Sequence, residues 1–333
     1  TLKLSVFGGE SSRHIEAPLI CLSRPQDVRI KHIFGRSQLL HHTYLFLATN
    51  ARGGMLRAGV SWGELKSRYD ALLAANLDPE IPEDRCILFS RCRAWVVYQG
   101  YSQEIGNDCL TAFHYDGDRM GKWRFQIPTG QGESSGLSIT AEKLPLKNAG
   151  RLTFLRHPAR MARRRLEDPN PVQLILRPDI EFRSFHETTK AFQGPENRWP
   201  AAIRSLTDGF LFTPAAAVIL KMTVSRGKFV SEPEWRYMVY HPLEAERGLD
   251  PNSDLFSPGY FTGTLAGGMC EILTAHAQSK EDGKFSFPVG LEKRIRHFFN
   301  QSPRREPPVP ALTKALDQYI VRRDQYATVI AGY

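Results

Sequence analysis

Apolar and polar side chains alternate along much of this chain, which is the pattern of strands with one buried face. Over Lys122–Ile127, three polar residues alternate with Trp, Phe and Ile. A period of two also runs over Trp235–Tyr240 and, in part, over Val172–Phe182. Further apolar runs predict a pair of strands at Cys86–Phe89 and Ala94–Tyr98, and a strand buried on both faces at Ala215–Val224.

Turn signals separate these runs about every 8–12 residues, a spacing typical of a sandwich or barrel. The chain contains 22 Pro and 26 Gly, enough for many such turns. We therefore predict a mainly β fold, a large antiparallel β-sandwich, over residues 1–285.

Helical patterns are few. Ser67–Leu77 and Ala266–Gln278 are weak candidates. The strongest is Pro308–Arg323, where a Pro stands at the start and four apolar residues share one face: Leu312, Leu316, Tyr319 and Ile320. The sequence thus predicts a linker helix near the C-terminus.

The end of the chain suggests a domain border. Gln301–Pro310 is rich in proline and is expected to be a stiff linker. We divide the chain into a β-sandwich at 1–285, a connecting segment with the linker at 286–310, and the linker helix with the chain end at 311–333. Ala327–Tyr333 is apolar, and an exposed apolar end suggests that something covers it in a larger protein.

Composition narrows the class of protein. The chain has 333 residues, of which 41% are hydrophobic, so it can bury a sizeable core. Its apolar runs are shorter than the roughly 20 residues that span a bilayer, and its start does not have the pattern of a signal peptide. Neither membrane binding nor secretion is expected.

Cofactor and metal signals are weak. The glycine loop Gly130–Gly136 has the wrong spacing for a dinucleotide fingerprint. The five cysteines are odd in number and none has C-x-x-C spacing: Cys21, Cys86, Cys92, Cys109 and Cys270. We expect buried thiols in a reducing cytoplasm, with no cofactor and no metal.

The formal net charge is +9, and the densest basic run is Arg156–Arg165. It is flanked by Glu167 and Asp168 and has no aromatic residues on which bases would stack. A solvated loop or the rim of a sugar-binding face is expected there. Nucleic-acid binding remains the weaker interpretation.

Three short stretches have residue types suited to binding. Asn50–Gly54 predicts a turn with left-handed residues, either a plain hairpin or a loop facing a sugar pocket, with Gly53 and Gly54 allowing close approach. Arg183 and His186 would act together only if the strand bends. They are either structural residues or contacts for sugar hydroxyls or another domain.

The third stretch is a charged turn. It contains Glu244, Glu246, Arg247, Asp250 and Asp254. We expect a structural network in which Arg247 pairs with a carboxylate, because the spacing does not match a calcium loop.

Carboxylate pairs and tryptophans offer alternative sites. Glycoside hydrolysis uses two carboxylates, and Glu232 with Glu234 or Asp116 with Asp118 have suitable spacing. Both pairs are expected to be solvated surface residues. Sugars stack on aromatic rings, so Trp62, Trp199 and Trp235 are either platforms or core residues.

Five blocks in order resemble the N-terminal domain of bacterial and archaeal glycogen debranching enzymes of the amylo-α-1,6-glucosidase type. They are Leu47–Gly54 (LATNARGG), Arg68–Ala75 (RYDALLAA), Leu176–His186 (LRPDIEFRSFH), Glu244–Phe261 (EAERGLDPNSDLFSPGYF) and Thr328–Tyr333 (TVIAGY). Some positions depart from the family pattern: Ala51 replaces Gly, Asp70-Ala71 replaces His-Gly, and Ser184 replaces Asp.

The resemblance implies a β-super-sandwich like the N-terminal domains of glucoamylase-like hydrolases. It also implies that the chain packs on its own C-terminal (α/α) barrel and helps to hold glycogen or another branched α-glucan. Catalytic residues are not expected in this chain. Candidate contacts to the substrate or the catalytic domain are Asn50, Gly53, Gly54, Arg68, Arg183, His186, Arg247, Asp250 and Asp254. A stand-alone carbohydrate-binding or structural protein is the main alternative.

Overall fold

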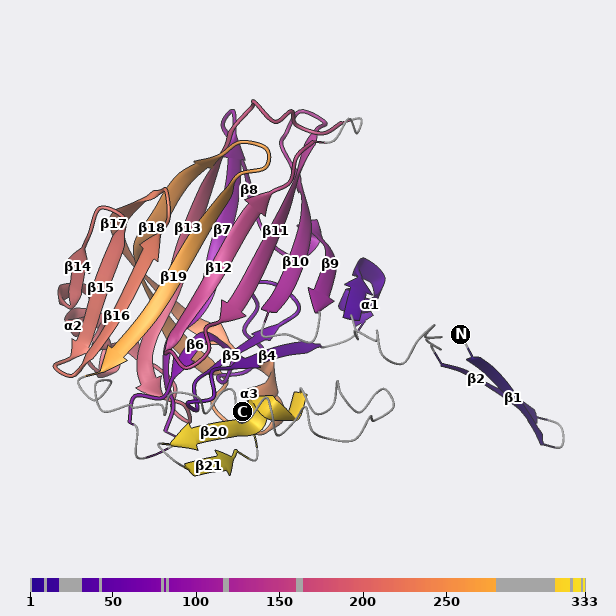
Figure 1. Ribbon diagram of the computed structural model, residues 1–333, viewed down its shortest axis with the longest axis horizontal. Helices are drawn as coiled ribbons and strands as arrows, with labels where there is room; N and C mark the ends of the chain where they lie inside the picture. The colour runs from indigo at the N-terminus through magenta and orange to yellow at the C-terminus, as the bar shows by residue number, and fades with distance from the viewer. Residues whose placement is uncertain are drawn as a thin grey trace.

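The computed structural model describes residues 2–8, 11–17, 32–41, 44–78, 81, 84–115, 120–159, 164–279, 315–323, 326–330 and 332. Two large antiparallel sheets lie face to face, as Figure 1 shows. The expected mainly β, antiparallel sandwich is confirmed. Its two layers enclose one continuous apolar core.

One layer has nine strands in the order β14-β15-β16-β19-β12-β11-β10-β9-β3. In chain order they are β3 (His32–Gly35), β9 (Leu110–Tyr115), β10 (Met120–Pro128), β11 (Ser134–Lys143), β12 (Ala149–Arg156), β14 (Ile203–Ser205), β15 (Gly209–Ala215), β16 (Val218–Val224) and β19 (Cys270–Ser279).

The other layer has eight strands, in the order β17-β18-β13-β7-β6-β5-β4 with β8 paired to β7. They are β4 (Leu45–Thr49), β5 (Met55–Gly59), β6 (Ala71–Ala75), β7 (Cys86–Tyr98), β8 (Tyr101–Glu104), β13 (Val172–Ser184), β17 (Lys228–Tyr240) and β18 (Asn252–Leu265).

Short elements complete the described chain. Two hairpins pair β1 (Leu2–Gly8) with β2 (Ser11–Ala17), and β20 (Ile320–Arg323) with β21 (Tyr326–Val329). The helices are α1 (Arg36–His41), α2 (Pro195–Ala201) and α3 (Pro242–Glu246), with 3-10 turns at Asn107–Cys109, Ala191–Gln193 and Asp317–Tyr319.

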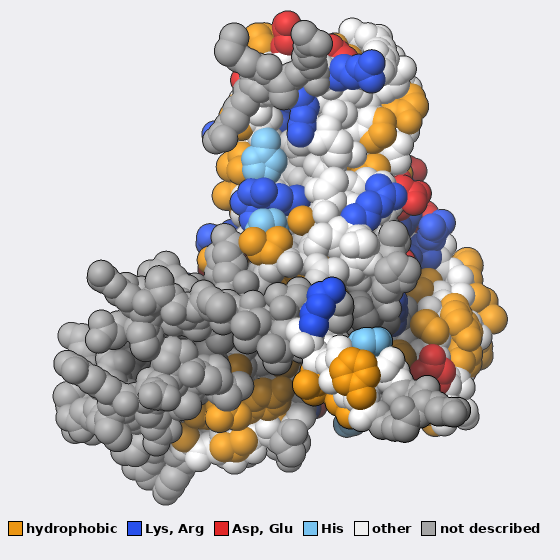
Figure 2. Space-filling model, turned by 90° about the vertical axis from the view of Figure 1, so that its right-hand side faces the viewer, with side chains coloured by type: hydrophobic (Ala, Val, Ile, Leu, Met, Phe, Trp, Pro, Cys, Tyr) orange, Lys and Arg blue, Asp and Glu red, His pale blue; other side chains and the backbone are white. Residues whose placement is uncertain are grey.

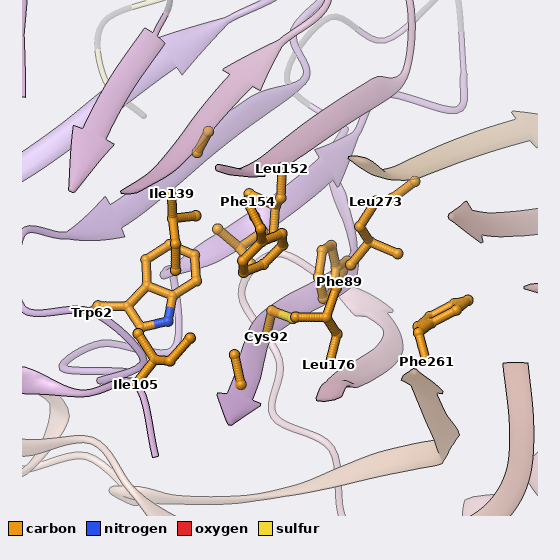
Figure 3. Packing of buried hydrophobic residues seen from close by; sticks show 14 of the residues in the cluster. Trp62, Phe89, Cys92, Ile105, Ile139, Leu152, Phe154, Leu176, Phe261 and Leu273 are labelled. Carbon is orange, nitrogen blue, oxygen red and sulfur yellow. The ribbon is translucent and has the colours of Figure 1, made fainter. Parts of the chain in front are cut away.

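Inward-facing side chains from both sheets form the core (Figure 3). Trp123 of β10 is fully buried, packs edge-on against Trp62, and donates its indole N–H to the carbonyl of Val60 over 2.8 Å. Phe154 of β12 and Phe261 of β18 come from opposite layers. The period of two seen in the sequence exists because alternate side chains must enter this space.

Several predicted strands are confirmed, with changes in their limits. Lys122–Ile127 lies inside β10, and Trp235–Tyr240 inside β17. The predicted pair at 86–89 and 94–98 is wrong, because both runs belong to the single strand β7. Ala215–Val224 is not one strand buried on both faces: the chain turns after Ala215, and β16 has alternating burial.

Both weak helix predictions are wrong. Residues 71–75 form β6, which is buried at every position, and such a short apolar run lacks a period that separates strand from helix. Residues 270–279 form β19, where Leu273, Ala275 and Ala277 alternate with less buried neighbours.

The predicted linker helix is wrong over its last residues. A helical turn at 315–316 and a 3-10 turn at 317–319 lead into the strand β20 at Ile320. Gln318 fixes this segment to β4: its side-chain oxygen accepts the N–H of Thr49 over 2.9 Å, and its carbonyl accepts the Thr49 hydroxyl over 2.7 Å. The segment 286–310 lies outside the described residues.

One residue of the basic run differs from the expected solvated loop, whereas Arg164 is exposed and residues 160–163 lie outside the described ranges. Arg156 is buried at the end of β12, where it donates to the carbonyls of Leu265 over 2.9 Å and Glu167 over 2.8 Å. It therefore joins strand ends and does not belong to a solvated loop. On the face seen in Figure 2, lysine and arginine side chains are interspersed with apolar, acidic and neutral ones. Among the described helices, none has the length and apolar character to cross a membrane.

Candidate functional site

The blocks that suggested function come together at one end of the eight-stranded sheet. Ser67–Asp70 precedes β6, Arg183 is the residue before the last one of β13, and Glu244 lies in α3 just after β17. Arg68 connects these parts: its guanidinium donates to the carbonyl of His186 over 3.0 Å, and its own carbonyl accepts from Arg183 over 2.6 Å. We call the set Ser67, Arg68, Glu181, Arg183, Glu244 and Arg247 the charged end.

Glu181 and Arg183 form the buried pair of the charged end. They lie two apart on β13, so both side chains point to the same face, and they meet at 2.6 Å. The hydroxyls of Ser90 and Thr189 also donate to Glu181, while Arg183 donates to the carbonyl of Glu187 over 2.8 Å. Both ions are therefore hydrogen-bonded as buried charges require.

Glu244 is the second buried carboxylate. One of its oxygens accepts the hydroxyl of Ser67 over 2.6 Å and the backbone N–H of Arg68 over 2.7 Å. The other accepts from Arg247 over 3.0 Å. The expected pairing of Arg247 with a carboxylate is confirmed, and Glu244 thereby fastens α3 to the turn that precedes β6.

Burial and hydrogen bonding compete in setting the pKa of each acid. Burial alone would raise the pKa of Glu181, but Arg183 and the hydroxyls of Ser90 and Thr189 lower it below its usual value. The pKa of Glu244 is lowered in the same way, by Ser67 and Arg68 against the effect of burial. Both acids are thus anions at neutral pH.

An exposed rim surrounds this closed network. Tyr69 packs on Phe185 with ring centroids 4.6 Å apart, and His186 meets both rings edge-on. His186 is exposed, and the side chain of Arg247 is 51% exposed. We call Arg68, Tyr69, His186 and Arg247 the rim. The rim lies beside the buried residues of the charged end and is the part of this region that another molecule can contact.

The last described residue lies next to the rim. The guanidinium of Arg85 sits 4.1 Å from the ring centre of Phe185 and donates to the carbonyl of Gly332 over 3.5 Å. Phe185 in turn contacts Tyr69 and His186. Val329 in the adjoining strand β21 is 70% exposed.

The two aspartates of the charged turn, Asp250 and Asp254, differ in exposure and in the groups that they bind. Asp254 is nearly buried and accepts the backbone N–H groups of Ala191 over 2.8 Å and Met238 over 3.0 Å, so it joins the 3-10 turn Ala191–Gln193 to β17. Asp250 is 58% exposed and pairs with Lys190 over 2.7 Å, which lowers its pKa. Only Asp250 is open to a partner.

Asn50, Gly53 and Gly54 lie in a closed turn between β4 and β5. Asn50 is fully buried: its side-chain oxygen accepts the N–H of Gly54 over 2.9 Å, and its amide donates to the carbonyl of Lys147 over 2.8 Å. The left-handed conformation is confirmed at Ala51 (φ 60°) and Gly53 (φ 95°). A Cβ at Gly54 would come within 2.9 Å of the carbonyl of Ala74.

Lys143 was not predicted and lies near this turn. It is completely buried at the end of β11 and donates to the carbonyl of Ala74 over 3.3 Å. Burial, with a smaller contribution from the charge of Arg52, lowers its pKa to about 7.

The other sequence candidates fall in different places. Trp62 and Trp199 are core residues, and half-buried Trp235 stacks on Trp199 at 5.5 Å. Glu234 pairs with Arg177 over 3.0 Å, and Glu232 pairs with the same arginine over 3.6 Å. The register of β17 shifts between Ser231 and Glu234, so Glu232 and Glu234 do not lie on a regular strand as the sequence suggested. Asp116 and Asp118 lie outside the described residues.

Sequence reasoning missed Ser90, Glu181 and Thr189. Glu181 lay within the quoted block 176–186, and its distance of two from Arg183 on a strand was the available signal. Ser90 and Thr189 come from β7 and a loop, so only the fold brings them to it. Across the described ranges, His, Cys, Asp and Glu side chains form no group of three suited to a metal ion.

Comparison with known proteins gives a family. The family model described as glycogen debranching enzyme N terminal matches residues 46–271. No curated protein matches the chain.

Solved structures give distant likenesses. One, assigned as a kojibiose phosphorylase from the human microbiome, is 9% identical with a TM-score of 0.37; the match covers 85% of this chain and 36% of that protein. Another, a GalM/aldose epimerase homologue from C. elegans, is 9% identical with a TM-score of 0.35, and the match covers 72% of this chain and 99% of that protein. The chain thus spans about a third of the length of the phosphorylase.

Proposed function

Because the chain belongs to the family of glycogen debranching enzyme N-terminal domains, we propose that it is the accessory β-sandwich domain of a glycoside hydrolase. The hydrolase would cleave α-1,6-glucosidic branch points in glycogen or a similar α-glucan. The domain would pack on a catalytic (α/α) barrel and border the substrate cleft with its rim.

The observation that carries the proposal is the pairing of a closed charged network with an open rim beside Gly332. The buried carboxylate of Glu244 pairs with Arg68 over 3.9 Å and with Arg247 over 3.0 Å, which holds both arginines in place. Arg85 links the ring of Phe185 to the backbone at Gly332. A domain that continues from this point would begin next to Tyr69 and His186. The rim is therefore the natural contact for it.

Catalysis is assigned to the partner domain. Hydrolysis of a glycosidic bond needs two carboxyl groups placed around the substrate, one to donate a proton and one to activate water or attack. Glu181 and Glu244 are both buried, ionised and paired with arginines. Neither can reach a sugar or give up a proton near neutral pH.

A reducing, cytoplasmic location agrees with the thiols. Cys86, Cys92 and Cys109 are free and buried, although two of them lie six apart on β7. Burial raises the pKa of Cys86 to about 12 and that of Cys92 further. Such thiols are inert and have no need of a disulfide partner.

The experiment begins with the reading frame beyond the Tyr333 codon and with expression of everything it encodes. We expect several hundred further codons with helical patterns, and release of linear chains from glycogen by the product. Arg247→Ala in that product should lower kcat/KM severalfold. A control, Arg151→Ala, replaces an arginine that is 42% exposed on the nine-stranded sheet and should have no effect.

Two results would contradict the proposal. A stop codon directly after Tyr333 would make the chain a stand-alone protein. A full-length product that leaves α-1,6 linkages intact would remove the debranching role.

A further inference from the structure

An open groove crosses the outer face of the eight-stranded sheet at the end away from the rim. Its volume is about 820 Å³, within the range of ligand sites. It is lined by Val97, Tyr98, Gln99, Gly100, Pro171, Val172, Gln173, Arg226, Gly227, Lys228, Thr262, Gly263, Thr264 and Met269. Strand β17 runs from this groove at Lys228 to the charged end at Tyr240, which is roughly 40 Å at 3.3 Å per residue.

The floor of the groove consists of cross-strand rows. Gln173 lies opposite Val97 on one side and Thr264 on the other. The next row passes through Trp95, Ile175, Thr262 and Lys228. Paired residues share a face of the sheet, so these side chains form one surface that runs across four strands.

One wall of the groove is built by a buried carboxylate. Glu271 of β19 accepts the backbone N–H groups of Ser225 over 2.8 Å and Arg226 over 3.0 Å, together with the Ser225 hydroxyl over 2.7 Å. A Cβ on Gly263 would lie 2.9 Å from this carboxylate on the core side of the sheet, because Gly263 pairs with the core residue Leu174. Glycine there lets Glu271 of the other sheet approach β18 from beneath the floor and hold the loop at Arg226 in place.

The opposite wall is the hairpin turn between β7 and β8. Gln99 and Gly100 both have positive φ, 46° and 83°, as a tight hairpin turn requires. The Gln99 amide donates to the hydroxyl of Tyr98 over 3.2 Å, which orients that ring at the groove edge. Both walls are thus held by hydrogen bonds within the chain.

We propose that this groove binds an unbranched stretch of α-glucan. An open trough across strands suits an extended chain, and its floor offers neutral donors and acceptors from Gln173, Thr262 and Thr264. Trp95, in the row next to Gln173, supplies a ring on the same face as these polar side chains. The cations Arg226 and Lys228 both lie on the β17 side of the groove, so a compact anion elsewhere in it would meet few charges.

The inference rests on the proposed function for the class of sugar, and it adds a second contact with substrate. One glucan molecule would be held at the groove while a branch point is processed beyond the rim. Holding a polymer at two places raises its effective concentration at the cleft.

The test measures binding of maltoheptaose by calorimetry, and retardation by amylopectin in native gels, for the full-length protein. Thr264→Trp fills the groove from an exposed position of the floor. Thr111→Trp places the same bulk at an exposed position of the nine-stranded sheet. We expect Thr264→Trp to weaken binding by roughly tenfold or more, as loss of a stacked and hydrogen-bonded ligand implies, and Thr111→Trp to leave it unchanged.

A second variant, Gln173→Ala, removes an amide that bonds the Thr262 hydroxyl over 2.9 Å and should weaken binding severalfold without lowering Tm. Equal affinity in the wild type and Thr264→Trp would overturn the proposal. Displacement of the sugar by inorganic phosphate would overturn it as well, because the groove would then be an anion site.

The groove and the proposed function fail separately. If the groove does not bind glucan, the Thr264→Trp variant still releases short branches from a small branched oligosaccharide at the wild-type rate, and it binds maltoheptaose as the wild type does. If the proposed function fails, neither substrate is cleaved whatever the groove binds. If both stand, Thr264→Trp loses activity on glycogen and keeps it on the small oligosaccharide.

Discussion

The two ends of the eight-stranded sheet use their polar side chains in opposite ways. At the charged end, Glu181, Arg183 and Glu244 are buried, and they form hydrogen bonds with other residues of the chain. In the groove, Gln173 and Thr264 are exposed on an open floor. Three of the five sequence blocks contribute residues to the charged end, whereas none of the residues that line the groove belongs to a block.

This difference shows that a sequence motif can mark a buried structural network, whereas the residues that bind a ligand on an open surface need not form a motif. Buried polar networks need particular residues, because any unpaired member costs free energy. Their positions are therefore recognisable in a sequence. An open floor of amides, hydroxyls and rings tolerates many residues, so a sugar groove leaves no short pattern.

The largest expected effect is the removal of a buried acid. Glu181→Ala should lower the free energy of unfolding by roughly 3–5 kcal/mol, because it leaves the Arg183 guanidinium buried without its anion. Urea denaturation measures the change. Glu232→Ala, at a carboxylate that is 58% exposed, should cost less than about 1 kcal/mol. Similar costs at both positions would contradict the claim that burial makes the charged end sensitive to the loss of one partner.

Acid should act on the charged end first. Glu181 and Glu244 have pKa values below their usual 4.5, so each stabilises the fold above that pH and loses its contribution as pH falls through the lowered value. Unfolding free energies at pH 7, 5, 4 and 3 should fall below pH 4.5. Glu244→Gln should flatten this dependence and Glu232→Gln should not. An unchanged slope in Glu244→Gln would count against the network.

Lys143 should give the opposite dependence. Its pKa falls from 10.5 to about 7, so between these values the unfolded chain binds a proton that the folded chain lacks, and stability rises with pH. Lys143→Met should remove this rise and add roughly 1 kcal/mol at pH 7. Denaturation at pH 7 and 9 tests both points. A variant that keeps the rise would place its origin elsewhere.

The smallest effect is expected at the rim. Arg247→Ala removes a half-exposed partner of Glu244 and should cost about 1 kcal/mol or less in the 333-residue chain. In the full-length protein the same change should lower kcat/KM severalfold under conditions in which the protein stays fully folded. An unchanged kcat/KM in the folded variant would mean that the rim is only structural.

Sequence reasoning reached the layered β fold because alternation follows directly from burial on one face, as at Trp123 and Phe125. It mistook Ala71–Ala75 for helix because a strand buried at every position has no alternation. It also predicted a helix at Ala266–Gln278, although Leu273, Ala275 and Ala277 alternate with more polar neighbours, which is the pattern of a strand.

The candidate site was found in part. The block at 176–186 and a dense charged turn identified Arg183, Glu244 and Arg247, yet exposure decides which residues can meet a partner. Asn50 and Asp254 are closed off, whereas His186 and Asp250 are open. The groove could not be predicted, since it joins residues from four strands and the Glu271 wall of the other sheet.

Hydroxyl-radical footprinting of the full-length protein tests the central claim most directly, because it reports side-chain exposure at both ends at once. Tyr69 and His186 should be protected relative to the 333-residue chain, with or without sugar. Met269 in the groove should gain protection only when maltoheptaose is added. Protection of Met269 without sugar, or of His186 only with sugar, would contradict the division between a domain contact at the rim and a glucan site in the groove.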